Sequence, residues 1–303
     1  MGKKILYFEA PDGISGDMTL GALIDLGADV KAIRQELDKF VQDEYALIPH
    51  SFERNGIHGV NLEVIVSEKA GTAEDGTDEK NKPSGLGDLV HEFNYADETD
   101  HELGLGDRVH EYEYFAGGHI THSYTRRSYK DIREMILASG ISRTSKTYAL
   151  EIFDTIAKAE AAVHQIKLEN VQFHEVGAMD SIIDIVGTAI AVDLLGEVDV
   201  YCSAVHDGSG TIISRHGVIP VPVPAVMEMA KDTDIPIVID DEVRTEMITP
   251  TGFGIIKGLK AKFEPSLGIF PEKTGYGFGK RNTGRLGAVR VTLGEKYEES
   301  EKK

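Results

Sequence analysis

The sequence has very little cysteine and comparatively few basic residues. Cys202 is the single cysteine in 303 residues, so the chain forms no intrachain disulfide and no cluster of thiolate metal ligands. Lysine and arginine number 32 against 51 aspartate and glutamate residues, which gives a formal net charge of −19. A charge of this sign repels nucleic acid and anionic membrane surfaces. We therefore expect neither a nucleic acid nor a membrane among the partners of this protein.

Long apolar segments are also missing. No apolar run reaches the roughly 20 residues that a helix needs to cross a bilayer. The opening segment, MGKKILYFEA, contains two lysines but lacks the long apolar core and small-residue cleavage site of a secretory signal. Together with the single cysteine, these absences predict a cytoplasmic protein. Hydrophobic residues still make up 41% of the chain, which is enough for a globular core.

The acidic charge is concentrated in one segment. Residues 68–118 contain 14 acidic and four basic residues, a net charge of −10, whereas the rest of the chain is mildly acidic. This segment includes GTAEDGTDEKNKPSG and shows no clear periodicity, which is typical of a flexible insertion. We therefore predict a main α/β domain formed by residues 1–67 and 119–294, a flexible acidic, histidine-bearing insertion at 68–118, and a charged tail at 295–303.

Predicted strands and helices alternate along the main domain. Hydrophobic patterns and turn residues predict strands at 4–10, 45–53, 59–67, 198–202, 211–213, 235–239 and 286–293. Helical spacing and end signals predict helices at 16–26, 29–41, 128–140, 145–166, 181–195, 224–230 and 250–260. This order favours an α/β fold in which helices cover a mixed sheet. For such an enzyme-like domain we also expect a homo-oligomer.

The segment DGISGDM, residues 12–18, joins a predicted strand to a predicted helix. Its glycines let backbone N–H groups point outward, and a helix N-terminus attracts anions such as phosphate. Asp17 is placed to cap the helix or to hold a cation that bridges to a phosphate. The Gly-Lys-Ser/Thr ending of a P-loop is missing. Two interpretations stay open, an ordinary capped turn and a binding site formed by Ser15, Gly16 and Asp17.

The segment HEVGAMDSIID combines metal-ligating residue types with a buried helix. Asp180 and Asp184 are four residues apart, so they lie on one helical face, and burying them requires a metal, an arginine or a helix cap as partner. His174 and Glu175 precede this helix and add donors suited to nickel, zinc or manganese. We expect His164 to face the same pocket. Alternatively, Asp180 caps the helix, Asp184 pairs with a basic residue and His174 packs in the core.

Five histidines lie within or next to the acidic segment: His91, His101, His110, His119 and His122. Imidazole at neutral pH suits first-row transition metals, and nickel stands high in their affinity order. The spacing is irregular and contains no H-E-x-x-H motif, which excludes a rigid catalytic zinc site of that type. The segment is either a loose metal-collecting tract, densest at His119 and His122, or a solvated acidic loop that contains histidines.

Three further segments contain groups that bind phosphate in other proteins. Residues 206–210 form a flexible polar turn in our interpretation, and Arg215 follows as a possible partner for a phosphate or carboxylate. Pro250 suits the first turn of a helix, and helix capping alone explains this segment. The glycine-rich segment 275–281 contains two basic residues. For all three, an ordinary structural role is favoured.

The chain contains no G-x-S-x-G elbow and no dinucleotide fingerprint. Its segments nevertheless occur together, in this order, in the LarC family, which the chain resembles over nearly its whole length. The resemblance rests on FEAPDGISGDMTLGALIDLG, YKDIREMI, IFDTIAKAEAAVH, FHEVGAMDSIIDIVG, HGVIPVPVPA, TPTG and GYGFGKR. The most specific of these blocks are FHEVGAMDSIIDIVG and DGISGDM.

Membership of this family implies insertion of nickel into pyridinium-3,5-bisthiocarboxylic acid mononucleotide, with consumption of CTP. The resemblance therefore implies a metal-inserting lyase that handles nickel, uses Mg or Mn with CTP, and takes the pincer-nucleotide precursor as substrate. Members of the family continue into a carboxy-terminal domain associated with CTP, so we expect such a domain as a separate partner.

Combining the resemblance with the residues gives a mechanism to test. The loop at Ser15, Gly16 and Asp17, or Arg215, holds the phosphate of the precursor. Nickel is held by His174, Glu175 and Asp184, with His119 and His122 as further ligands. His174, Glu175 and Asp180 form the catalytic group, in which His174 or Glu175 removes the ring proton as general base. Two rival functions stay open: a nickel-binding or storage protein without turnover, and a metal-dependent phosphoester hydrolase.

Overall fold

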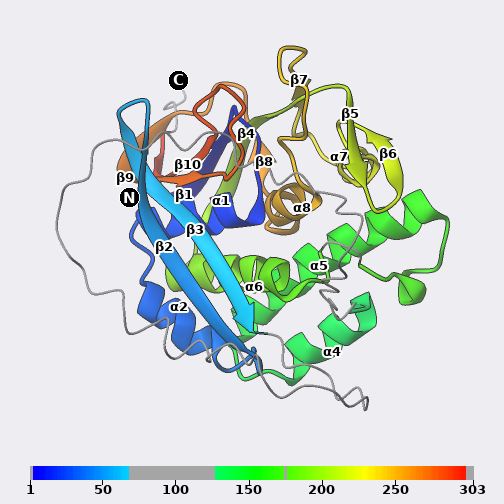
Figure 1. Ribbon diagram of the computed structural model, residues 1–303. Coiled ribbons are helices and arrows are strands. Elements are labelled where there is room, and N and C mark those ends of the chain that lie inside the picture. Colours follow the sequence, from blue (N-terminus) through cyan, green and yellow to red (C-terminus); the bar gives the residue numbers. More distant parts are fainter. Residues whose placement is uncertain (1–2, 68–126, 174–175, 298–303) are drawn as a thin grey trace, which may run out of the picture.

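A computed structural model describes residues 3–67, 127–173 and 176–297 of the chain (Figure 1). The predicted acidic insertion at 68–118 lies outside the described residues, as do residues 298–303 of the predicted tail. Among the described helices, none is long and apolar enough to cross a membrane.

The order of elements alternates as the sequence predicts. The strands are β1 (Lys4–Ala10), β2 (Glu44–Arg54), β3 (Ile57–Ser67), β4 (Asp199–Asp207), β5 (Thr211–Ser214), β6 (Gly217–Pro220), β7 (Ile237–Ile239), β8 (Lys262–Phe263), β9 (Ile269–Phe278) and β10 (Ala288–Lys296). The helices are α1 (Gly16–Asp25), α2 (Val30–Leu37), α4 (Tyr129–Ala138), α5 (Arg143–His164), α6 (Met179–Leu194), α7 (Pro224–Ala230) and α8 (Pro250–Gly258), with a short 3-10 helix at Leu168–Asn170.

Eight strands form one mixed sheet, in the order β2-β3-β9-β10-β1-β4-β7, with β8 paired to β4. Strand β4 runs parallel to β1, β7 and β8, whereas β10 runs antiparallel to both of its neighbours. Strands β5 and β6 form a separate antiparallel hairpin. The predicted mixed α/β class is therefore confirmed for the described residues.

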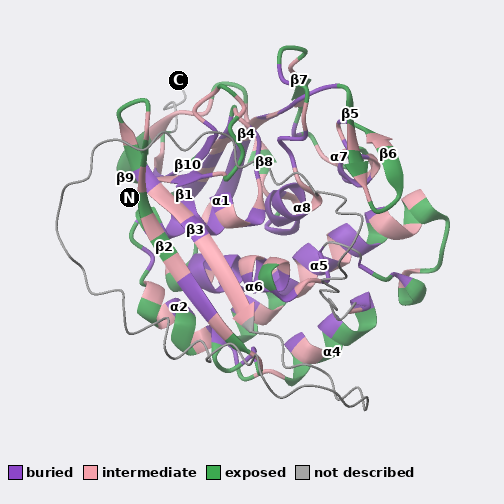
Figure 2. Ribbon diagram, in the orientation of Figure 1, coloured by how far each residue is buried: buried purple, intermediate pink, exposed green. Residues whose placement is uncertain are grey.

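The helices form successive layers against one face of the sheet. Helix α1 packs on β3, β9 and β10, α6 packs on α1, and α5 packs on α6 and α8. Figure 2 shows these inner helices and the middle strands as largely buried. Along β1, Leu6 and Phe8 belong to the core under the helices, whereas Glu9, which points the other way, pairs with Arg290 on β10. The face opposite the helices thus carries this ion pair, together with the buried Ile5.

Strand β9 is an element that the periodicity did not predict. Its residues Gly275 and Gly277 lie in the glycine-rich segment 275–281, and α1 packs directly on this strand. A β-carbon at Gly277 would lie 1.8 Å from the backbone oxygen of Met18, so only glycine allows this approach. The glycines therefore bring α1 close to the sheet, which agrees with the structural role favoured for the segment.

Local end signals explain the helices that surround the site. Gly27, with φ +113°, follows α1 and supplies the left-handed residue at its end. Ser128 and Asp131 form a reciprocal capping box at the start of α4. Helix α2 ends at Leu37, four residues before the predicted end, because residues 38–41 form turns that return the chain to β2.

Candidate functional site

The parallel strands of the sheet bring three loops to one edge. Strands β1, β4 and β7 are parallel neighbours, so their carboxyl ends lie at the same edge. Strand β1 leads through residues 11–15 into α1, and β7 leads through residues 240–249 into α8. Ligands of α/β proteins bind at this kind of edge, in the crevice outside the strand ends. Figure 1 shows α1 and α8 starting beside each other at this place.

Asp207, the last residue of β4, ties two of these loops together. Its Oδ1 atom accepts hydrogen bonds from the backbone N–H groups of Gly208 at 2.8 Å, Met247 at 2.7 Å and Ile248 at 3.2 Å. The residue is fully buried, and its Oδ2 atom has no hydrogen-bond partner among the described residues. Burial raises the pKa of this carboxyl, although the three N–H groups and Arg281 act in the opposite direction. The predicted flexible polar turn at 206–210 is therefore wrong, because Asp207 anchors a buried junction.

The loop before α1 is joined to the segment before α8. Ile14 donates its N–H to the carbonyl of Met247 at 2.9 Å and accepts from the N–H of Thr249 at 3.0 Å. Gly13 has φ +88°, and a β-carbon there would lie 2.2 Å from the Met247 oxygen. Thr249 caps α8 by accepting from Gly252 N at 3.1 Å, as predicted for this helix start. These contacts bring the first turns of α1 and α8 together.

Helix α6 meets the same place through Asp184. A β-carbon at Gly16 would lie 2.9 Å from Asp184 Oδ2 and 2.9 Å from the Thr251 methyl group. The first residues of α1 and α8 therefore share one contact region with the first turns of α6. The two most specific sequence blocks, DGISGDM and FHEVGAMDSIIDIVG, meet at this contact.

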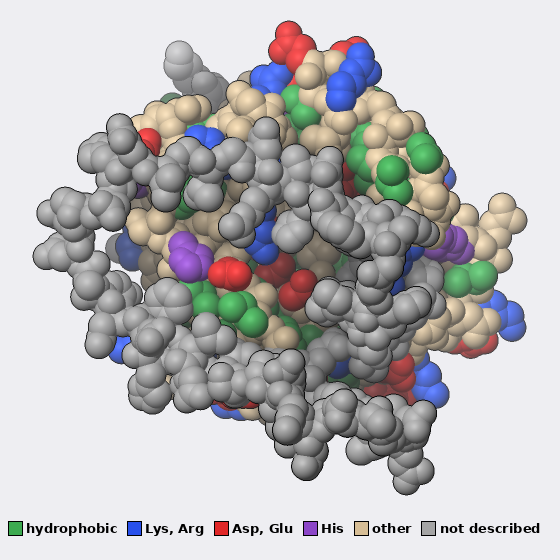
Figure 3. Space-filling model, in the orientation of Figure 1, with side chains coloured by type: hydrophobic (Ala, Val, Ile, Leu, Met, Phe, Trp, Pro, Cys, Tyr) green, Lys and Arg blue, Asp and Glu red, His purple; other side chains and the backbone are tan. Residues whose placement is uncertain are grey.

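The electrostatic environment of Asp184 is unusual. Burial raises the pKa of this carboxyl well above its ordinary value, and the charges of Asp17 and Asp180 raise it further, whereas Lys280 lowers it. Asp184 Oδ1 is shielded from solvent and has no hydrogen-bond partner among the described residues. Figure 3 shows acidic side chains gathered over the region of α1 and α6, with a basic side chain beside them. Among the described residues, no three His, Cys, Asp or Glu side chains are arranged to hold a metal, so a cation bound at Asp184 needs donors beyond these carboxylates.

The other residues of the two blocks have local partners. Ser15 occupies the N-cap position of α1 but makes no side-chain cap bond, and its hydroxyl instead donates to Asp17 Oδ1. Asp17 Oδ1 also accepts from Met18 N at 3.0 Å. Asp180 is exposed in the first turn of α6, and its Oδ1 accepts from the N–H of Ser181 at 2.8 Å. The alternative prediction that Asp180 caps the helix is wrong, because Ala178 is the N-cap of α6 and the helix start has no side-chain cap bond.

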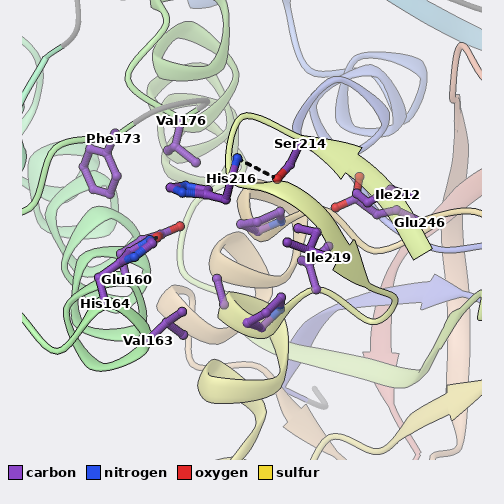
Figure 4. Close-up of a pocket in the computed structure, with 14 residues that line it drawn as sticks. Glu160, Val163, His164, Phe173, Val176, Ile212, Ser214, His216, Ile219 and Glu246 are labelled. Atoms are coloured by element: carbon purple, nitrogen blue, oxygen red, sulfur yellow. Dashed lines mark hydrogen bonds and ion pairs between the residues drawn. The ribbon is translucent and has the colours of Figure 1, made fainter. Parts of the chain in front are cut away.

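A pocket of about 140 Å³ opens on the other side of the first turn of α8 (Figure 4). Its walls come from α5, the β5–β6 hairpin, and the starts of α7 and α8. Apolar side chains on these walls include Phe173, Val176, Ile212, Ile219, Val223 and Pro250. The polar lining consists of Glu160, His164, Ser214, His216 and Glu246. Because Pro250 lines the pocket and the next residue contacts Gly16, the pocket and the acidic group flank one helix start.

Comparisons with known proteins identify the family. The family model described as nickel insertion protein matches residues 6–303. The chain belongs to this family. It is 41% identical over 295 residues to the pyridinium-3,5-bisthiocarboxylic acid mononucleotide nickel insertion protein of Acetivibrio thermocellus and 40% identical over 294 residues to that of Lactiplantibacillus plantarum. These alignments cover 97% of the chain but only 61% and 62% of the two relatives. A putative nickel insertion protein of Citrifermentans bemidjiense is 36% identical. No solved structure matches the chain.

The described residues place only part of the predicted nickel insertion site. Ser15, Gly16, Asp17, Asp180 and Asp184 come together around the starts of α1 and α6, as shown above. The predicted ligands His174, Glu175, His119 and His122 lie outside the described residues. Phe173, Val176 and His164 line the pocket, whereas Asp180 and Asp184 do not. The prediction that His164 faces the same pocket as His174 stays a prediction, because His174 lies outside the described residues.

Arg215 is exposed in the turn between β5 and β6, next to the pocket-lining residues Ser214 and His216. Sequence reasoning missed Glu160 and Glu246 as pocket residues. Glu160 has a signal in retrospect, since it lies four residues before His164 and therefore on the same helical face. Glu246, with 8% of its surface exposed, pairs with Arg281 at 3.3 Å and carries no comparable signal.

Proposed function

We propose that this chain inserts nickel into pyridinium-3,5-bisthiocarboxylic acid mononucleotide to form the nickel pincer cofactor. Membership of the nickel insertion family supports this proposal, as do the names of its curated relatives from two organisms. Nickel is here a substrate that the protein passes on. The proposed reaction consumes CTP with Mg or Mn and places the protein among the metal-inserting lyases.

The contact of Gly16 with Asp184 is the observation that supports a cation site most directly. It joins the two most specific sequence blocks, and the other oxygen of the same carboxylate, Oδ1, is buried without a hydrogen-bond partner among the described residues. A divalent cation satisfies such an oxygen and offsets the repulsion from Asp17 and Asp180. We assign Asp184 as a nickel ligand on this ground.

The remaining roles follow from chemistry and position. His174 and Glu175 supply nitrogen and oxygen donors for nickel, and one of them removes the ring proton as general base. Asp180, at the exposed start of α6, belongs to the same catalytic group. The phosphate of the precursor binds at the loop Ser15-Gly16-Asp17, through a cation held by Asp17, or at Arg215. The adjoining pocket receives the pyridinium ring between its apolar walls.

The chain spans about three fifths of the length of the two named relatives. We propose that the part of those relatives beyond the aligned region corresponds to a carboxy-terminal domain that handles CTP and acts with this chain. We also propose that the chain forms a homo-oligomer in the cytoplasm.

A reconstituted reaction tests the function. The chain is mixed with the precursor, Ni²⁺, CTP and Mg²⁺, with and without the carboxy-terminal part of the Acetivibrio thermocellus relative, and the nickel-bearing product is identified by mass spectrometry. We expect product only when CTP is present. Nickel binding without product, with all components supplied, would instead support the storage protein, and phosphate release from the mononucleotide would support the hydrolase.

Single variants test the assigned residues. Glu175→Gln should lower the rate by about 10²–10⁴-fold if Glu175 is the general base, and Asp184→Asn should weaken nickel transfer. Asp232→Asn, which removes an exposed carboxylate at another place, is the matched control and should leave the rate unchanged. Full activity in Asp184→Asn would remove Asp184 from the metal site.

A further inference from the structure

Two histidines from distant parts of the sequence meet at the pocket described above. His164 is the last residue of α5, and His216 lies in the turn of the β5–β6 hairpin. Their ring centroids are 4.8 Å apart, with 39° between the ring planes. Figure 4 shows both side chains on the pocket wall, with Glu160 beside His164. His216 is exposed and His164 is one-third exposed, so both side chains reach the surface at this pocket.

Neighbouring groups hold each histidine. Glu160 lies one turn earlier on α5, and its Oε2 atom is 3.2 Å from His164 Nε2. A carboxylate in this position orients an imidazole and makes it a better metal ligand. The backbone of His216 is held by the N–H that it donates to Ser214 Oγ at 3.1 Å. Gly217, with φ +87°, follows directly and shapes the tight turn of the hairpin.

The spacing of the two rings suits a shared metal ion. Metal–nitrogen bonds of about 2.0–2.1 Å place two nitrogens on one ion roughly 3–3.5 Å apart. Rings whose centroids are 4.8 Å apart reach that separation with small side-chain rotations. Imidazole nitrogen is also a donor that suits nickel among the first-row metals.

We propose that His164 and His216 form an entry site for a divalent first-row metal ion at the pocket, with Glu160 as positioning residue. The identity of the metal as nickel on its way to the precursor rests on the function proposed above. Within the described part of the chain, no group of three or more His, Cys, Asp or Glu side chains is arranged to hold a metal. Among the described residues, the pair therefore supplies two ligands of the proposed site.

Incomplete coordination fits a site that must release its ion. Full protein coordination characterises structural sites, whereas transfer requires positions that incoming ligands can occupy. The precursor named for the relatives carries two thiocarboxylic acid groups, and sulfur is a good ligand for late first-row metals. A precursor seated against the apolar wall of Phe173, Val176 and Ile219 would present its sulfurs to an ion held by the two imidazoles.

The test uses the full chain and Co²⁺ alone as a paramagnetic probe, followed by proton NMR. Imidazole N–H protons of coordinated histidines give exchangeable, strongly shifted signals. We expect His164→Ala and His216→Ala each to abolish the same pair of signals and to weaken Ni²⁺ binding at this site at least tenfold. Glu160→Gln should keep both signals and weaken binding about tenfold.

His50→Ala is the matched control. His50 Nε2 lies 3.1 Å from Glu63 Oε2, with both side chains partly exposed, so this variant removes a histidine beside a carboxylate at another place. It should leave the paired signals unchanged. The proposal is overturned if those signals persist in His164→Ala or His216→Ala, or if they disappear in His50→Ala. Circular dichroism establishes that the exposed substitutions leave the fold intact.

The test of the entry site can fail independently of the test of nickel insertion. The NMR experiment contains neither precursor nor CTP, so paired signals in the wild type support the entry site even if reconstitution yields no product. In an active system, the double variant His164→Ala/His216→Ala should need at least tenfold more Ni²⁺ for half-maximal rate. An unchanged nickel requirement would contradict the entry role.

Discussion

The carboxylate of Asp184 on α6 lies directly against Gly16 at the start of α1. A β-carbon at position 16 would stand 2.8 Å from the Asp184 Cβ atom and 2.9 Å from its Oδ2 atom. Both neighbours belong to a short side chain on a buried helix, so they have little room to move. This contact couples the loop that follows β1 to the acidic helix, and any residue larger than glycine disturbs both.

Gly16→Ala should therefore damage stability and nickel insertion together. The added methyl group collides with Asp184 and with Thr251 on α8, and relieving such overpacking costs about 1–3 kcal/mol. Urea unfolding measures the loss, and the reconstituted reaction measures activity. Gly140→Ala is the control, because its β-carbon meets only the Lys39 side chain, at 3.4 Å or more. Equal stability of the two variants would contradict the close approach.

Asp207→Ala should be strongly destabilising. The substitution leaves the backbone N–H groups of Gly208, Met247 and Ile248 without their buried acceptor, and each unsatisfied group costs about 1–3 kcal/mol. Because these groups position the segment before α8, we also expect loss of nickel insertion. A decrease in unfolding free energy below about 1 kcal/mol, measured in urea, would show that other groups hold this junction.

Asp207→Asn should change how stability depends on pH. Burial raises the pKa of the Asp207 carboxyl in the folded chain, so ionisation favours the unfolded state. This cost is absent below the unfolded pKa of about 3.9, grows as pH rises above it, and is complete above the raised folded pKa. Asparagine does not titrate. Relative to the variant, the wild type should lose unfolding free energy as the pH rises above about 4; a constant difference would contradict the raised pKa.

Most of the sheet and its covering helices could be predicted from local patterns. Strand β1 and helices α1, α5 and α7 lie where apolar spacing and end residues placed them. Strand β9 escaped prediction because Gly275 and Gly277 interrupt its alternation; it is a strand because β10 and β3 pair with it on either side. Glycine there serves the packing of α1, a tertiary requirement that no local pattern reveals.

The candidate site likewise has a part that local spacing predicts and a part that depends on the tertiary fold. Spacing alone grouped Asp180 with Asp184 on one helical face, but only the fold brings Gly16, from a distant segment, against Asp184. Asp207 was assigned to a flexible turn because Gly208 and Gly210 follow it, whereas the parallel pairing of β4 buries it. The meeting of His164 with His216 likewise depends on where the hairpin folds back.

Gly277→Ala tests the packing of α1 on β9. Its β-carbon would lie 1.8 Å from the Met18 carbonyl oxygen and 2.5 Å from the Ala22 nitrogen, both backbone atoms of a buried helix. We expect a loss of about 3 kcal/mol or more of unfolding free energy, measured in urea. Gly279→Ala, two residues along, meets the flexible Met18 sulfur at 3.0 Å and should be nearly neutral. Similar losses in the two variants would mean that α1 adjusts freely.

Asp184→Asn should separate metal binding from stability. In the metal-free chain, the Asp184 carboxyl is buried and repelled by Asp17 and Asp180, which is why its pKa is raised. Removing its charge relieves this cost, so the metal-free variant should unfold at higher urea concentration than the wild type at pH 7. A ligand that binds only the folded chain adds about 2.7 kcal/mol at 100 times its Kd.

Nickel should therefore stabilise the wild type, and this increment should shrink in Asp184→Asn although the metal-free variant is the more stable protein. A gain in metal-free stability together with a loss of stabilisation by nickel would identify Asp184 as a carboxylate that disfavours folding but binds the cation. Asp232→Asn, with its exposed position, should reproduce the wild-type increment. If Asp184→Asn lowers metal-free stability and keeps the full nickel increment, Asp184 is a structural group and the cation binds elsewhere.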